Sequence, residues 1–292
     1  MILNFFSCQL KENVKVKYLK LLGIGIFGLL FLYICIKFKF FSRKYVYLND
    51  NWQYASFSKI YSDPAFLYRS NMFKRKNIVV AINAGHGTSG GQKVMTYCHP
   101  DKSAKVTGGT TSIGSIQSYS ISDGTSFSNG ITEAEVNLKV ANYLKERLLI
   151  NGYDVLMLRI SDDTKLDNIA RTIIANNVAD VHISIHFDAS SLDNGAFYIS
   201  VPDLNEYREM YPVSEHWRNH EKLGECLIKG LKNKDVKVAA FNSIPLDLTQ
   251  TSFSTIPSVD IELGDLKSDI SEKALKKYAN GLYEGIEIYF EK

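Results

Sequence analysis

The sequence is poor in cysteine, with four among 292 residues at positions 8, 35, 98 and 226, and no two of them form a CxxC pair. A zinc site built on cysteine pairs is therefore excluded. Cys98 and Cys226 lie beyond the N-terminal apolar segment. We expect two isolated thiols there, because nothing in the sequence requires them to pair.

The chain also lacks an excess of basic residues outside its N-terminus. Residues 1–44 carry eight Lys/Arg and one acidic residue, which leaves 26 basic and 30 acidic residues in the remainder. Because a nucleic-acid-binding domain presents a basic face, we expect no nucleic-acid partner. A hydrophobic content of 45% and an aromatic content of 12% predict a globular core.

An N-terminal apolar segment predicts a membrane anchor. Its uninterrupted core, residues 21–36, is slightly short of a full span, but flanking lysines can reach the interfaces and extend it. No small-residue cleavage site follows, which disfavours a cleaved signal peptide. Ile34 disfavours lipidation at Cys35. We expect a cytoplasmic tail over 1–18, a transmembrane signal-anchor over 19–41 and an aromatic juxtamembrane segment over 42–76.

From about Asn77 onward, strand and helix patterns alternate. This alternation is typical of an α/β domain, expected here over 77–291 as a single domain with a twisted, largely parallel but mixed sheet flanked by helices. Apolar, β-branched runs predict the strands, and a 3.6-residue apolar period predicts the helices. The expected strands cover 78–83, 154–159, 181–186, 196–201 and 258–262, and the expected helices cover 133–150, 165–177, 214–232 and 271–290.

Four residues stand at the turning points of this alternation: His86, Glu133, His186 and Glu262. Three lie at or just past the ends of expected strands, the edge where open α/β sheets build their sites, and Glu133 opens a helix. Two imidazoles and a carboxylate form a three-ligand set that can hold a catalytic zinc with one position left for water. Glu262 is then available as a general base.

The other four histidines are not expected to bind this metal. His182 shares a strand face with His186, but four residues separate them by about 13 Å, so one zinc cannot take both. We assign His186 to the metal because it ends the strand, and we expect His182 to be structural. His216 and His220 are expected to form an exposed pair on an amphipathic helix, and no partner is identified for His99.

A segment rich in glycine, serine and threonine interrupts the alternation, with 23 such residues among the 44 of 87–130. A loop this long is usually functional or mobile. Because it begins beside His86 and ends beside Glu133, we expect it to shape or cover the cleft. Its low apolar content predicts that it does not contribute to the core.

The stretch from about Asn77 to Glu291 resembles the zinc-dependent N-acetylmuramoyl-L-alanine amidases of the amidase_3 type, in a clostridial-like branch. The resemblance rests on the GHG after the first strand, E-x-x-x-N-L from Glu133, GYDVLMLR, SIH and IELG. It implies that His86, Glu133 and His186 bind zinc and that Glu262 is catalytic. NAGHG in place of DPGHG, HFDAS in place of HANA and the long loop depart from the family pattern.

The resemblance implies a cell-wall hydrolase that cleaves the amide bond between N-acetylmuramic acid and L-alanine in peptidoglycan. Its substrate lies outside the cytoplasm, so we expect the N-terminus inside and the catalytic domain outside the cell membrane. Basic residues are equal in number on both sides of the expected span and do not set this orientation. Two alternatives stay open: another zinc amide hydrolase, such as a deacetylase or peptidase, or a non-catalytic wall-binding module. No activating protein is identified.

Overall fold

The computed structural model describes residues 25, 28 and 43–291. The chain divides into two compact units, residues 1–42 and residues 43–292. The expected cytoplasmic tail and signal-anchor lie outside the described residues, apart from Gly25 and Gly28, which have helical backbone. Among the described residues, no helix has both the length and the hydropathy needed to cross a bilayer.

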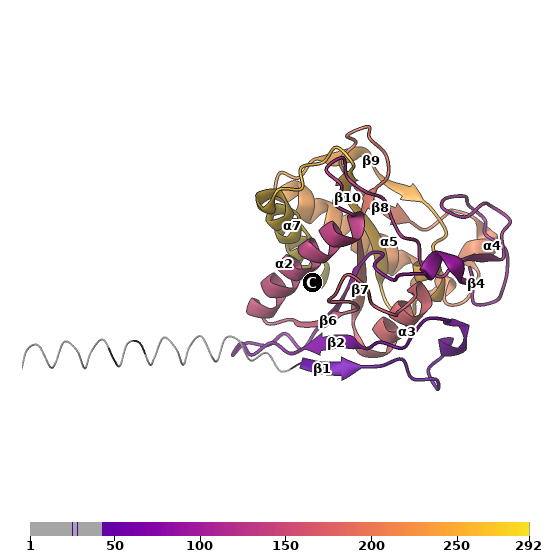
Figure 1. The fold of residues 1–292 in the computed structure, drawn as a ribbon, viewed down its shortest axis with the longest axis horizontal. Coiled ribbons are helices and arrows are strands. Elements are labelled where there is room, and N and C mark those ends of the chain that lie inside the picture. The colour runs from indigo at the N-terminus through magenta and orange to yellow at the C-terminus, as the bar shows by residue number, and fades with distance from the viewer. Residues whose placement is uncertain (1–24, 26–27, 29–42, 292) are drawn as a thin grey trace, which may run out of the picture. The chain divides into compact units, whose positions relative to one another are not determined.

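An eight-stranded mixed sheet forms the centre of the second unit, in the order β1-β2-β6-β3-β7-β10-β8-β9. In Figure 1 the sheet runs from β1, at the lower edge of the domain, upward to β9. The central pairs β6–β3, β3–β7 and β7–β10 are parallel, whereas β1–β2, β2–β6 and β8–β10 are antiparallel. The strands are β1 Arg43–Val46, β2 Ala65–Tyr68, β3 Val79–Ala84, β6 Asp154–Met157, β7 Val181–Asp188, β8 Ala196–Ser200, β9 Val238–Pro245 and β10 Ser258–Asp265. This arrangement confirms the expected α/β class and the largely parallel sheet.

Helices cover both faces of this sheet (Figure 1). On one face α2 (Glu133–Ile150), α5 (Val213–Asn233) and α7 (Glu272–Phe290) pack together, and on the other lie α3 (Asn168–Val178) and α6 (Thr249–Phe253). The remaining short elements are η1 Ala55–Phe57, η2 Gly91–Lys93, α4 Asn205–Arg208 and the hairpin of β4 Met95–Tyr97 and β5 Gln117–Tyr119. Every strand and helix expected within residues 77–291 is present, with ends that agree to within a few residues.

A capping box fixes the start of α2, and this start positions the site. The Thr132 hydroxyl accepts from the backbone N–H of Glu135 at 3.2 Å, and the Glu135 carboxylate accepts from the backbone N–H of Thr132 at 2.8 Å. Two of the otherwise unpaired donors at a helix start are satisfied in this way. Glu133 therefore occupies the first helical position, where its carboxylate faces the sheet.

The compact unit that contains the expected domain begins at Arg43, before the boundary expected near Asn77. Strands β1 and β2 extend the sheet beyond β6. Between them, the Ser58 hydroxyl and the backbone N–H groups of Lys59 and Ile60 donate to the buried carboxylate of Asp167, at 2.7–3.0 Å. The aromatic residues of 42–76 thus belong to this domain: Tyr54 and Phe57, for example, pack edge-on against Phe253.

The 87–130 segment also differs from expectation, because it is anchored and partly buried. Cys98, His99 and Ile121 are each 1% exposed. The segment is held by the buried carboxylate of Asp247, which lies 2.7 Å from Lys105 Nζ and accepts from the backbone N–H of Val106 at 2.7 Å. The expectation that this loop does not contribute to the core is therefore wrong. The loop has little apolar surface to bury, but a buried ion pair and hydrogen bonds stabilise it in place. Cys98 and Cys226 are free thiols, as expected.

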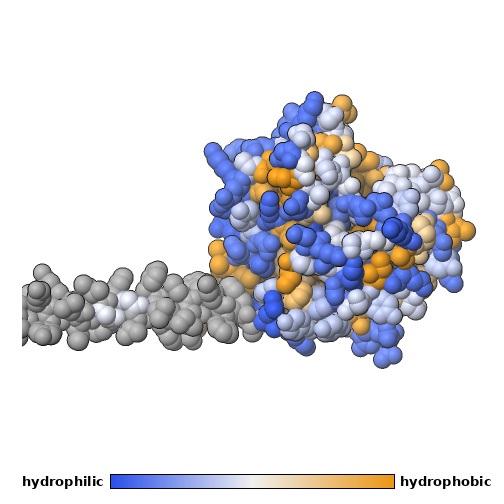
Figure 2. All heavy atoms as spheres, in the orientation of Figure 1, coloured by the Kyte–Doolittle hydropathy of each residue, from blue (hydrophilic) through white to orange (hydrophobic). Residues whose placement is uncertain are grey.

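The surface of the domain is mixed in character. On the face shown in Figure 2, hydrophobic residues form separate patches among hydrophilic ones. Such interspersion is ordinary for a folded domain whose core is closed by helices on both sides of a sheet.

The anchoring of the long loop predicts a large stability effect at Asp247. Asp247→Ala leaves the ammonium of Lys105, whose side chain is 8% exposed, without its buried counter-charge. Breaking a buried pair in this way costs ~3–5 kcal/mol, so we expect a drop of that size in the free energy of unfolding, measured by urea denaturation. The control is Asp203→Ala, at an ion pair whose carboxylate is 86% exposed, which should change stability by less than ~0.5 kcal/mol. Equal stabilities of the two variants would contradict the assignment.

Candidate functional site

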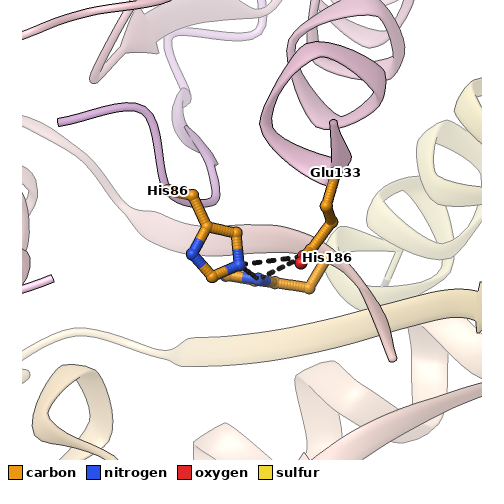
Figure 3. Close-up of side chains that lie close together, drawn as sticks. All are labelled: His86, Glu133 and His186. Carbon is orange, nitrogen blue, oxygen red and sulfur yellow. Dashed lines mark hydrogen bonds and ion pairs between the residues drawn. The ribbon is translucent and has the colours of Figure 1, made fainter. Parts of the chain in front are cut away.

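Three potential ligands converge from three elements (Figure 3). His86 lies in the turn after β3, Glu133 at the start of α2, and His186 on β7. Glu133 Oε1 is 2.9 Å from His86 Nε2 and 3.0 Å from His186 Nδ1. The two imidazole nitrogens are 3.1 Å apart. The structure thus brings together the three residues that the sequence selected as ligands.

The His86 turn has a backbone that few residues can adopt. His86 has a φ of 64°, in the left-handed region, and Gly87 follows with a φ of 75°. A Cβ atom on Gly85 would lie 2.1 Å from Cε1 of His186, so only glycine fits between the turn and that ring. The GHG sequence is therefore what lets the two imidazoles approach each other.

Two fully buried arginines hold this turn in place. Arg159 donates to the carbonyl oxygens of Ala84 at 2.7 Å and Gly85 at 3.0 Å. Arg171 donates to the carbonyl oxygen of His86 at 2.8 Å. Burial lowers the pKa of Arg159 to about 10 and that of Arg171 to about 9. Both guanidiniums therefore remain charged at neutral pH.

The polarity of the contacts fits a metal ion between the three ligands. His86 Nδ1 lies 2.8 Å from the carbonyl oxygen of Ser122. A carbonyl can only accept, so Nδ1 carries the proton and the Nε2 of the neutral ring presents a lone pair. This lone pair faces the Glu133 carboxylate, and two acceptors at 2.9 Å repel each other unless a proton or cation lies between them. Zinc bonds of about 2.0–2.1 Å in a tetrahedral centre place ligand atoms roughly 3.3 Å apart, which requires only a small outward movement.

Without a metal, the electrostatics of the cluster favour positive charge at His186. Burial raises the pKa of Glu133, but hydrogen bonds from His186 and His86 outweigh it and hold the pKa far below its usual range. Burial lowers the pKa of His186, but the charge of Asp260 and the hydrogen bond to Glu133 raise it to about 10. A site that retains a proton so strongly is a site that can accept a cation.

Glu262 lies beside the cluster on the neighbouring strand. It pairs in register with His186 across the parallel β10–β7 ladder, and its Oε2 is buried without a hydrogen-bond partner. Burial raises the pKa of Glu262 well above its usual value; the charge of His186 opposes this shift and that of Asp260 adds to it. A carboxyl group with a raised pKa can exchange a proton near neutral pH, which is the property that general acid–base chemistry requires.

Asp260 is a site residue to which the sequence reasoning gave no role. Its Oδ2 is 3.6 Å from His186 Nε2, and a ligand atom from each of His186, Asp260 and Glu262 lies within 4.8 Å of the others. The alternation of residues 258–263 placed Asp260 and Glu262 on one face. This alternation could have identified Asp260. However, only the pairing of β10 with β7 shows that this face of β10 lies beside His186.

The other histidines lie outside this cluster. His182 is fully buried, deeper on the same face of β7. His220 is 2% exposed and its Nδ1 accepts from the backbone N–H of Ser258 at 2.9 Å, so the expectation of an exposed His216–His220 pair is wrong. His99 has the partner that the sequence did not identify, because its Nε2 is 3.2 Å from Asp247.

A cleft of about 680 Å³ opens over the cluster. His86, Glu133, His186, Asp260 and Glu262 lie along it, together with residues of the 87–130 loop. The loop residues that line the cleft are Gln92, Lys105, Gly108, Gly109, Thr110, Thr111, Ser118, Tyr119, Ile121, Ser122, Gly124 and Thr125. The expectation that this loop shapes the cleft is therefore confirmed.

Known proteins resemble this chain in fold and sequence. The curated protein YqiI of Bacillus subtilis (strain 168), described as uncharacterized, is 26% identical over 167 residues, covering 56% of this chain and 77% of that protein. Among solved structures, the N-acetylmuramyl-L-alanine amidase Ami1 from Mycobacterium smegmatis has a TM-score of 0.60 and 17% identity, over 73% of this chain and 96% of that one. The CwlD amidase from Clostridioides difficile, solved in complex with the GerS lipoprotein, has a TM-score of 0.51 and 20% identity, over 73% and 98%.

These structural likenesses establish a shared fold. The sequence establishes more, because the family model for N-acetylmuramoyl-L-alanine amidase matches residues 80–287, which is most of the chain and contains all four residues selected from the sequence. The chain belongs to the Amidase_3 family of N-acetylmuramoyl-L-alanine amidases, the peptidoglycan hydrolases that cleave the amide bond between N-acetylmuramic acid and L-alanine.

Proposed function

We propose that this amidase holds a zinc ion through His86, Glu133 and His186 and uses Glu262 to transfer protons. One observation carries the proposal: three ligand atoms lie within 3.1 Å of one another at the floor of an open cleft. Beside them stands a buried carboxyl group with an unpartnered oxygen. Catalytic zinc sites likewise have three protein ligands and a fourth coordination position that water or substrate can reach.

In the proposed reaction, Glu262 transfers protons and the three ligands hold the zinc ion. When bound, zinc would supply a Lewis acid that polarises the scissile carbonyl and lowers the pKa of a water molecule. Glu262 accepts a proton from the attacking water as the new carbon–oxygen bond forms. It then delivers that proton to the amine nitrogen as the carbon–nitrogen bond breaks. The products are the lactyl carboxylate of the glycan and the free amino group of the stem peptide.

We further propose that residues 19–41 anchor the chain in the cell membrane, with the N-terminus in the cytoplasm and the catalytic domain outside. The support is the apolar run over 21–36, the lack of a cleavage site after it and the extracytoplasmic location of peptidoglycan. The catalytic unit begins at Arg43, immediately after the proposed span.

Histidine substitutions test the metal centre. The compact unit 43–292 should bind one zinc ion, and His86→Ala or His186→Ala should abolish stoichiometric binding because each removes one of three ligands. His182→Ala and His216→Ala are the controls and should retain the metal. Zinc content is measured by elemental analysis of folded protein, with folding checked by circular dichroism. Equal metal loss in all four variants would show that the ligands are misassigned.

Glu262→Gln tests the proton-transfer role. The amide keeps the shape of the side chain but cannot act as a base, so turnover on purified peptidoglycan should fall by ~10²–10⁴-fold. Zinc content should stay at one, because Glu262 is not one of the three proposed ligands. Fragment masses should show muramic acid–L-alanine cleavage for the parent protein. Undiminished cleavage by the variant would place the base elsewhere, and loss of zinc would make Glu262 a ligand.

Fractionation tests the anchor. The full chain should sediment with membranes, resist a high-salt wash and begin at its own N-terminus, whereas a matched chain that starts at Arg43 should stay in the supernatant. Protease added to cells stripped of their wall should remove the catalytic domain, because that domain is proposed to lie outside. A mature protein that begins near residue 42 would refute the anchor.

A further inference from the structure

The ring of His186 has two polar edges, and only one faces the proposed metal. Nδ1 points to His86 and Glu133, at 3.1 and 3.0 Å. Nε2 lies 3.1 Å from the hydroxyl oxygen of Ser184 and 3.6 Å from Oδ2 of Asp260. For Nδ1 to present a lone pair to a metal, the single proton of the neutral ring must sit on Nε2. The groups around Nε2 therefore decide whether His186 can be a ligand.

Ser184 is held by a chain of hydrogen bonds that begins at a buried charge. Arg171 donates to Oδ1 of Asn83 at 2.9 Å, and Nδ2 of Asn83 donates to the Ser184 hydroxyl oxygen at 3.0 Å. This bond uses one lone pair of the hydroxyl and leaves the other free to accept from Nε2–H of His186. It does not force that polarity, because a hydroxyl can also donate its hydrogen to Nε2.

Asp260 supplies the charge that selects one polarity. It is the register partner of Ser184 across the β10–β7 ladder, just as Glu262 is the partner of His186. Its side chain is only 14% exposed, and its Oδ1 is buried without a hydrogen-bond partner. A carboxylate 3.6 Å from Nε2 favours a hydrogen on that nitrogen electrostatically, although the separation is too long for a direct hydrogen bond.

We propose that Asp260 is a positioning residue that keeps the proton of His186 on Nε2 and so turns Nδ1 into a metal ligand. The inference rests on the zinc centre proposed above and adds a residue to it. Asp260 acts together with Ser184, which holds the orientation of the ring while the carboxylate selects the nitrogen that carries the hydrogen. Second-sphere carboxylates of this kind raise the basicity of the ligand nitrogen and fix its tautomer.

Zinc affinity of the full chain, purified in detergent, tests this role. Competition with a chromophoric chelator should show Asp260→Asn weakening zinc binding by ~10–100-fold, the usual effect of removing such a partner. Asp260→Glu keeps a carboxylate and should recover part of the loss. The matched control is Asp188→Asn, which removes a carboxylate from the same cleft and should change zinc affinity far less. Thermal unfolding of the metal-free variants checks that they fold.

A second readout reports directly on the ring. In zinc-loaded protein with ¹⁵N-labelled histidine, the Nε2–H signal of His186 reports on this nitrogen. Asp260→Asn should shift this signal upfield and speed its exchange with water, and Asp188→Asn should not. A purely structural role for Asp260 would lower thermal stability without moving this resonance selectively.

Each outcome has a defined meaning. Weaker zinc binding together with a shifted Nε2–H signal supports the positioning role. Unchanged affinity and an unchanged signal overturn it, and so does an equal loss in Asp188→Asn, which would indicate the general charge of the cleft. Two zinc ions per parent chain and one in Asp260→Asn would also overturn it, because Asp260 would then ligate a second ion. A parent chain that binds no zinc refutes the proposed centre itself.

Discussion

The site depends above all on two buried guanidiniums. Arg159 and Arg171 are fully buried, and the bonds that fix the turn after β3 run from them to carbonyl oxygens of that turn. A buried charge without partners costs several kcal/mol, so the turn carbonyls and the arginines stabilise each other only when both are in place. This mutual requirement holds His86 in a left-handed conformation that the residue alone would disfavour. Arg159 also donates to the carbonyl of Ala134 at 2.5 Å, which joins the start of α2 to the same turn.

Strand register then places the proposed proton-transfer group, Glu262, relative to the proposed ligand His186. In the β10–β7 ladder Glu262 stands opposite His186 and Asp260 opposite Ser184. A shift of one residue would turn both carboxylates to the other face of the sheet, where α2, α5 and α7 pack. The apolar residues Val259, Ile261 and Leu263 oppose such a shift, because each is no more than 1% exposed on that face. The packing of the core therefore sets the positions of Asp260 and Glu262 relative to His186.

The positions of the site residues could be predicted from local sequence pattern, whereas features that depend on distant contacts could not. His86, His186 and Glu262 could be selected because polar residues at strand ends of an α/β sheet gather at one edge. The anchoring of the long loop could not, since Asp247 meets Lys105 across 142 positions of the chain. The sequence did contain a signal for the burial of His220. It stands three and seven residues before the buried Leu223 and Leu227, on the apolar stripe of α5.

The balance of charge explains why the three ligands can coexist. Glu133, Asp260 and Glu262 bring three carboxyl groups to one site, and carboxylates this close cannot all ionise without compensating positive charge. The buried arginines donate mainly to carbonyl oxygens of the turn and of the α2 start, so they compensate only part of it. In the metal-free protein, protons supply part of the compensation. Burial lowers the pKa of His186, but the charge of Asp260 and the hydrogen bond to Glu133 raise it, and burial together with the charge of Asp260 raises the pKa of Glu262. A divalent cation held by the three proposed ligands would supply that positive charge in place of the proton on His186 Nδ1. The same excess of acceptors that makes the bare site unfavourable therefore favours the binding of a cation.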